Sequence, residues 1–208
     1  HVSLFTPLST NGSQSGQCVN EFSLNLFFAY SAGLDGLEIG YFVNSEKAFV
    51  KGVQIAGFSN VNLGWTDGVQ GAGFANFSGD WMKGVQGAGF ANLALGDFEG
   101  LQGTGFANLV MGDMKGVQGS GFANVATGMV DGFQATGFGN LTTGSVFGGQ
   151  ASGFLNVSGG KVKGVQASGF GNIAGDGVNG VQAAGFMNIT ADDVKGAQLS
   201  GFLNVAND

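Results

Sequence analysis

The fold of this chain is decided by residues 84–99, which read GVQGAGFANLALGDFE. They form one copy of a sixteen-residue repeat whose glycine-x-glutamine start recurs without insertion or deletion. Copies begin at Gly52, Gly68, Gly84, Gly100, Gly116, Gly132, Gly148, Gly164, Gly180 and Gly196. Position 1 of the repeat is this glycine, and position 16 is the residue before the next one. A short, fixed period indicates that each unit packs against the next copy.

Strands fit this repeat better than helices. Two or three glycines in sixteen residues would each cost about 1 kcal/mol relative to alanine in a helix. The sequence therefore predicts an all-β fold, a β-solenoid with one coil per sixteen-residue repeat and about 11–12 coils. A transmembrane β-barrel is the competing fold, but a spanning hairpin would need more than about twenty residues per repeat.

The pattern divides the chain into three regions. Residues 1–20 hold the only proline and a Ser/Thr/Asn/Gly cluster, so we expect an N-terminal arm or loop there. Residues 21–51 are expected to form an N-terminal strand, around Phe22–Tyr30, and a degenerate first coil around Gly36–Asn44. Residues 52–208 are the ten solenoid repeats.

Composition argues against several classes of protein. The chain has 42 glycines, 20 phenylalanines and only 10% charged residues, unlike a disordered chain. Its net charge of −7 and its lack of arginine disfavour nucleic acid as a partner. His1 is the only histidine and Cys18 the only cysteine. We therefore expect no catalytic, cofactor-binding or metal residues, no cofactor and no small-molecule substrate.

In a solenoid, each repeat position becomes a column of equivalent residues. Stacked carboxamides can donate to one neighbour and accept from the other, so we expect buried structural ladders of asparagine and glutamine. We expect the phenylalanines to stack in the core, each worth about 2–3 kcal/mol on burial. The ladder residues include Asn60, Asn76, Asn92, Asn108, Asn124, Gln54, Gln70, Gln86, Gln102, Gln118, Phe58, Phe74, Phe90, Phe106 and Phe122. A sugar- or ion-binding row of amides and an exposed, polysaccharide-binding row of rings are the alternatives.

Charge is confined to one part of the repeat. Positions 1 to 10 contain no Asp, Glu, Lys or Arg, and every charge of the repeats lies at positions 13 to 16. We expect those four positions to face water. A sheet with one solvated face would normally carry charge on it. The uncharged face, on the side without phenylalanine, is therefore predicted to pack on another molecule or surface.

The two ends of the chain are further candidates for assembly. The repeat runs to Asp208 without a change of pattern, so we expect an uncapped end that a neighbouring subunit covers. The apolar strand near the N-terminus could add to such an edge, and head-to-tail contact of this kind builds filaments. The candidate assembly residues are Phe22, Leu24, Leu26, Phe28, Tyr30, Phe202 and Val205.

Gly36–Asn44 and Gly52–Asn60 follow the pattern G-[VL]-Q-x-x-G-[FL]-x-N, with Glu38 in place of glutamine in the first. With the strand before them, they make the chain from Phe22 to Asp208 resemble bacterial surface repeat-containing proteins. The resemblance implies export and a cell-surface location, and it supplies no activity or functional residues. Because the chain begins with His1, we expect a mature form whose signal peptide is removed.

These patterns together predict a non-enzymatic extracellular structural protein. Its partners would be copies of itself, assembled into a filament or surface layer through the uncharged face and the ends, with association to the outer membrane or cell surface. The alternative is a cell-surface binding module whose flat face recognises a glycan, ice or an outer-membrane partner. An enzyme ranks third, since no acidic or basic cluster interrupts the repeat.

Overall fold

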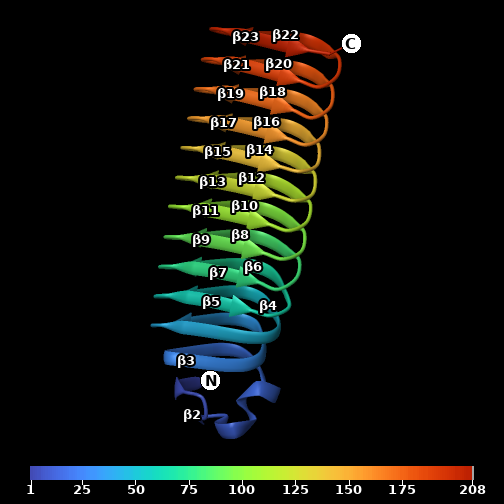
Figure 1. The fold of residues 1–208 in the computed structure, drawn as a ribbon. Coiled ribbons are helices and arrows are strands. Elements are labelled where there is room, and N and C mark those ends of the chain that lie inside the picture. The colour runs from blue at the N-terminus through green and yellow to red at the C-terminus, as the bar shows by residue number, and fades with distance from the viewer. Residues whose placement is uncertain (208) are drawn as a thin grey trace. The chain divides into compact units, whose positions relative to one another are not determined.

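A computed structural model describes residues 1–207 of the chain. By its internal contacts the chain divides into two compact units, His1–Thr104 and Gly105–Asp208. In each unit a long strand and a short strand make one coil, and equivalent residues sixteen apart pair in parallel, as Phe98 does with Met82. Figure 1 shows these coils stacked within each unit. The predicted fold class, an all-β solenoid with one coil per repeat, is confirmed.

The first unit begins with irregular structure and continues as coils. Its first elements are β1 (Val2–Phe5), β2 (Leu8–Ser9), the 3-10 helix η1 (Gly12–Gln17), β3 (Val19–Gly40) and β4 (Val43–Ala56). The later long strands are β6 (Trp65–Ala72), β8 (Met82–Ala88) and β10 (Phe98–Thr104), and the short strands are β5 (Ser59–Asn62), β7 (Ala75–Ser78) and β9 (Ala91–Ala94). Strand β1 pairs in parallel with β3, so the segment expected to be an arm or loop folds against the first coil.

The second unit consists of coils alone. Its long strands are β12 (Met114–Ser120), β14 (Val130–Thr136), β16 (Val146–Ser152), β18 (Val162–Ser168), β20 (Val178–Ala184) and β22 (Val194–Ser200). Its short strands are β11 (Ala107–Val110), β13 (Ala123–Ala126), β15 (Gly139–Thr142), β17 (Leu155–Ser158), β19 (Gly171–Ala174), β21 (Met187–Thr190) and β23 (Leu203–Ala206). The pairing is in register without bulges, as between β18 and β20.

Two glycines of every repeat are required by the close approach of neighbouring coils. At position 1, Gly164 has φ +139°, and a Cβ on it would lie 1.9 Å from the carbonyl oxygen of Gly148. At position 6, where the long strand turns into the short one, a Cβ on Gly169 would lie 2.1 Å from the carbonyl oxygen of Gly153. Only glycine permits both contacts, which explains why the repeat keeps these two residues.

The interior of the coil is lined by amides as well as by apolar side chains. Positions 3 and 9 point inward, and Gln166 and Asn172 have no exposed surface. The apolar part of the interior is position 15, where Phe98 and Val162 are buried, with smaller residues such as Ala126 at position 11. Since apolar side chains fill only part of this space, hydrogen bonds must satisfy the remaining buried groups.

The two amide columns form hydrogen-bonded ladders that run in opposite directions. Gln166 Nε2 donates to Gln150 Oε1 of the preceding coil at 2.8 Å. Asn156 Nδ2 instead donates to Asn172 Oδ1 of the following coil at 2.9 Å, and also to the backbone carbonyl of Ala167 at 2.7 Å. The amide dipoles of one ladder therefore oppose those of the other, and the asparagines tie the short strands to the long ones.

Candidate interaction surface

The phenylalanine column lies on the outside of the coil. Phe58 is 40% exposed and Phe122 is 44% exposed, and both sit in the turn after position 6. Within each unit the rings stack on one another, with ring centroids 4.9 Å apart between Phe58 and Phe74 and between Phe106 and Phe122. This corrects the expectation that the phenylalanines fill the core. The column is an apolar ridge along the edge of each unit.

The outer faces of both sheets carry uncharged side chains next to this ridge. On the long strands, position 2 places Val69 and Val85 in solvent in the first unit, and Val117 and Val165 in the second. On the short strands, positions 8 and 10 point outward and are partly exposed. Exposed apolar columns of this extent are unusual on a protein that stays monomeric.

The charged side chains lie after the short strand, in the turn that follows it and at the start of the next long strand. Position 16 is exposed, and Lys83 and Glu99 of neighbouring coils approach to 3.6 Å. A second pair, Lys51 with Asp35, is 3.2 Å apart. Pairs this exposed contribute little stability. The charged side chains of position 16 face water, as the sequence predicted, but position 15 points inward and belongs to the core, because side chains alternate along the strand.

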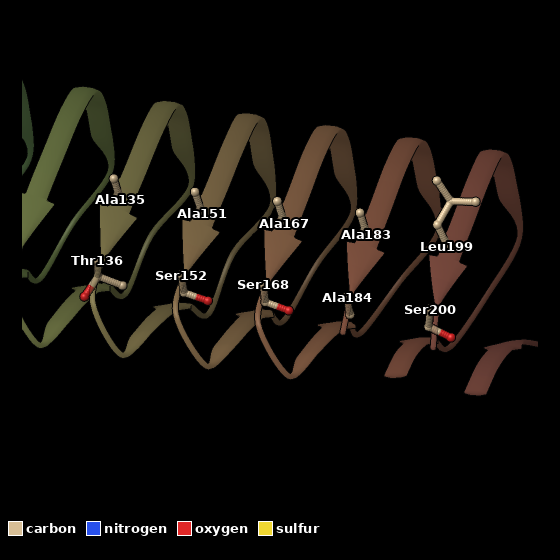
Figure 2. A pocket seen from close by; sticks show the side chains of 10 residues that line it. All are labelled: Ala135, Thr136, Ala151, Ser152, Ala167, Ser168, Ala183, Ala184, Leu199 and Ser200. Carbon is tan, nitrogen blue, oxygen red and sulfur yellow. The ribbon is translucent and has the colours of Figure 1, made fainter. Parts of the chain in front are cut away.

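Two hollows follow the uncharged columns of the second unit. The larger, of about 690 Å³, is a shallow trough lined by small residues of positions 4 and 5. Figure 2 shows the alanines projecting from the strands and the hydroxyl side chains at the strand ends. The hydroxyl oxygens of Ser152, Ser168 and Ser200 are buried there without a hydrogen-bond partner. The smaller hollow, of about 270 Å³, lies on the short strands between the phenylalanines and position 10.

The structure places the amide ladders where they cannot serve as a binding row. Asn60, Asn76, Gln54 and Gln70 are enclosed within the coil, and each donates to an amide or carboxylate of a neighbouring coil. A ligand outside the coil would meet the alternating outward residues instead. A sugar- or ion-binding function for these amides is therefore excluded.

The candidate assembly residues near the N-terminus are exposed, but their backbone is already paired. Phe22, Leu24, Leu26 and Phe28 project into solvent, whereas Tyr30 is half-buried. Strand β3, which carries them, pairs with β1 on one side and with β4 on the other. Their side chains thus remain available, while the strand lacks the free edge that adding to a partner's sheet would need. Near the other end, Phe202 is exposed and Val205 is half-buried.

The first coil contains a buried carboxyl pair that the repeat pattern did not predict. Glu38 stands in the glutamine column and accepts from Gln54 Nε2 at 2.8 Å and from Asn25 Nδ2 at 2.7 Å. Glu46 accepts from Ser31 Oγ, and its Oε1 has no hydrogen-bond partner. Burial raises the pKa of both groups, and the nearby Glu38 charge further raises the pKa of Glu46, to about 9. Glu46 therefore holds its proton at neutral pH.

Within residues 1–207, no three His, Cys, Asp or Glu side chains are grouped so that they could hold a metal ion. The helical structure formed by the same residues includes no segment that is long and apolar enough to span a membrane. Comparison with protein-family models, with curated proteins and with solved structures gives no match to this chain. The surface features of the coils are therefore the basis for a functional proposal.

Proposed function

We propose that this protein is a non-enzymatic structural subunit that self-associates through the uncharged outer columns of its coils, into a filament or a surface layer. The observation that carries the proposal is the inverted polarity of the coil. Amide ladders occupy much of the inside, where Gln166 and Asn172 are enclosed, while the apolar side chains of Phe122 and Val165 are exposed. Burying such columns against another copy would remove several hundred Å² of apolar surface from water.

The experiment is sedimentation velocity of the purified protein at neutral pH from micromolar to millimolar concentration, with electron microscopy of the same samples. We expect the weight-average mass to rise with concentration and ordered assemblies to form at the upper end. Monomers over the whole range, with no assemblies in the images, would refute self-association.

A binding module is the second candidate, favoured by the trough of the second unit. Its regular row of alanines gives a flat surface that could contact a flat ligand such as a glycan or ice. A glycan array and a thermal-hysteresis measurement test this function. The variant Ala151→Leu should abolish any signal, because it fills the trough without entering the interior.

We also propose an extracellular or cell-surface location. The support is the resemblance of the G-[VL]-Q-x-x-G-F-x-N units, from Gly52 onward, to bacterial surface repeat-containing proteins. Accessibility of the protein to an added protease on intact source cells is the test. Protection on intact cells, together with digestion after lysis, would contradict the location and leave the proposal of self-association standing.

A further inference from the structure

The outward column at position 8 of the second unit changes from small to large along the stack. In successive in-register short strands it reads Ala107, Ala123, Gly139, Leu155, Gly171, Met187 and Leu203. The first three side chains are small. A Cβ on Gly171 would lie 3.3 Å from both Leu155 Cδ1 and Met187 Cγ, so these two long side chains lean over the glycine between them. The column is thus a groove over three coils followed by a ridge over four coils, and its first six coils form the self-complementary part.

The hollow beside Gly139 gives the groove its shape. It measures about 270 Å³, its walls are apolar side chains that include Phe122, Phe138 and Leu141, and Leu155 stands at its end. Its lining carries no charged residue. Water in such a hollow has few polar partners, so an apolar side chain is the better occupant.

We infer that a second copy of this chain occupies this groove, in a two-fold dimer that packs short-strand face against short-strand face. A two-fold axis parallel to the strands, passing between the coils of Gly139 and Leu155, reverses the stacking order of the second copy. It places Leu155 of the second copy over Gly139, and Gly139 of the second copy over Leu155. The same operation sets Met187 opposite Ala107, so each large residue meets a small one.

A two-fold contact requires this self-complementary order, because the same patch serves both subunits. The next outward column, position 10, supports it: Leu141 would meet Val157, and Val125 would meet Ile173, all apolar and of similar size. This inference rests on the proposed self-association and specifies which face and which register it uses.

The area of the short-strand face sets the expected affinity of the dimer. Six coils about 4.8 Å apart and four residues about 3.3 Å apart make a face on the order of 400 Å². Two such faces total about 800 Å² before the relief of their side chains is counted, below the standard size of stable specific interfaces and in the range of weak, transient ones. We therefore expect a reversible dimer at micromolar concentrations.

The test exchanges the residues that form the groove and the ridge. Gly139→Leu fills the groove and Leu155→Gly removes the ridge, so each single variant should raise the dimer dissociation constant at least about tenfold. The double variant Gly139→Leu/Leu155→Gly restores a large residue opposite a small one at both places. It should return the constant to within about threefold of the unaltered chain. Sedimentation equilibrium measures all four proteins, and circular dichroism verifies their fold.

Two further variants complete the design. Gly119→Leu makes a similar change on the long strand, where an added Cβ meets nothing within 4 Å, and should leave the dissociation constant unchanged. Leu155→Ala replaces Leu155→Gly if the glycine variant loses its fold, since other repeats carry alanine at this position.

The outcomes separate this inference from the broader proposal. If the unaltered chain associates but Gly139→Leu has no effect, or the double variant is not rescued, this face and register are refuted and self-association stands. If the unaltered chain is monomeric at every concentration, both fall.

Discussion

At the scale of single residues, this coil tolerates a polar interior because its ladders leave few amide groups unpaired. Gln166 donates to Gln150 and accepts from Gln182, whose Nε2 lies 2.7 Å from Gln166 Oε1. A buried amide satisfied in this way costs little, whereas an orphaned one carries its full desolvation penalty. Each glutamine therefore stabilises the fold chiefly by supplying hydrogen-bond partners to the buried amides of its two neighbours.

We predict that Gln166→Leu destabilises the second unit although it makes the interior more apolar. The change leaves Gln150 Oε1 and Gln182 Nε2 without partners, at about 1–3 kcal/mol for each buried group. Urea unfolding followed by circular dichroism should give a loss of about 2–4 kcal/mol. The matched change at an exposed position, Asn179→Leu, should cost less than about 0.5 kcal/mol. Equal stability of the two variants would contradict the role of the ladder.

The buried carboxyl pair predicts how the stability of the first unit depends on pH. The pKa of Glu46 rises from its ordinary value of 4.5 to about 9 in the folded chain, chiefly through burial. A raised acid pKa means that the protonated form stabilises the fold. This contribution is complete below pH 4.5 and is lost as the pH rises through about 9.

The measurement is urea unfolding at a series of pH values, followed by the fluorescence of Trp65 and Trp81, which both lie in the first unit. We expect the midpoint to fall between pH 4.5 and pH 9. Glu46→Gln, a neutral side chain of the same shape, should remove at least about half of this dependence. Glu21→Gln, at an exposed site, serves as the control. A profile that Glu46→Gln leaves unchanged would show that another group is responsible.

At the scale of the strand and turn, the coil depends on backbones that approach too closely for a side chain. Position 1 makes this demand through its positive φ and the neighbouring carbonyl, whereas position 4 does not. A Cβ on Gly119 would meet nothing within 4 Å, and other repeats carry alanine at this position. The glycines of one repeat are therefore of two kinds.

We predict that Gly164→Ala and Gly119→Ala have opposite effects on stability. The first forces a Cβ to within 1.9 Å of Gly148 O at a φ of +139°, and should destabilise the second unit by more than about 3 kcal/mol. The second should be neutral or stabilise by about 0.4–1 kcal/mol, because it restricts the unfolded chain. Thermal unfolding of both variants decides the matter, and similar losses in the two would argue against this account.

The turn at position 6 explains which part of the surface could be predicted from the sequence. The sixteen-residue period predicts the solenoid coil, and the carboxamides at positions 3 and 9 predict its ladders. Both predictions depend on residues that repeat in register. The phenylalanines were misplaced because Gln54 and Phe58 are four residues apart and share a face only in an unbroken strand. Gly57 turns the chain between them, so the alternation restarts and Phe58 points outward. The glycine directly before each phenylalanine of position 7 is the sequence signal for this turn.

The carboxyl pair and the groove show a second limit of the repeat pattern. Glu38 was recognised as a substitute for glutamine, but its pairing with Glu46 depends on how β3 and β4 fold over each other. The order of small and large residues at position 8 is visible in the sequence. That this order forms a groove follows only from the position of Gly139 and Leu155 on the outside of the coil. Both features are departures from the repeat and required the three-dimensional arrangement.

At the scale of the whole molecule, the uncharged surface and the net charge have opposite effects on association between copies. Apolar columns such as position 2 favour association, while a net charge of −7 at pH 7 keeps copies apart. Within the repeats the charges lie on positions 13 to 16; position 16 shares the outward face of the long strand with position 2, whereas the short-strand face proposed to pack carries no charge. Repulsion therefore tunes association without entering the interface.

We predict that association strengthens as the pH falls from 7 toward the isoelectric point near 4.4, and that added NaCl strengthens it at pH 7. Light scattering at fixed concentration measures both effects. Lys163→Glu, which adds two negative charges at an exposed position, should weaken association at pH 7, and Asp131→Asn should strengthen it. Neither side chain lies on the short-strand face, so both effects should vanish at high salt. Effects that persist there would mean that these residues contact the partner directly, and the charged edge would then be part of the interface.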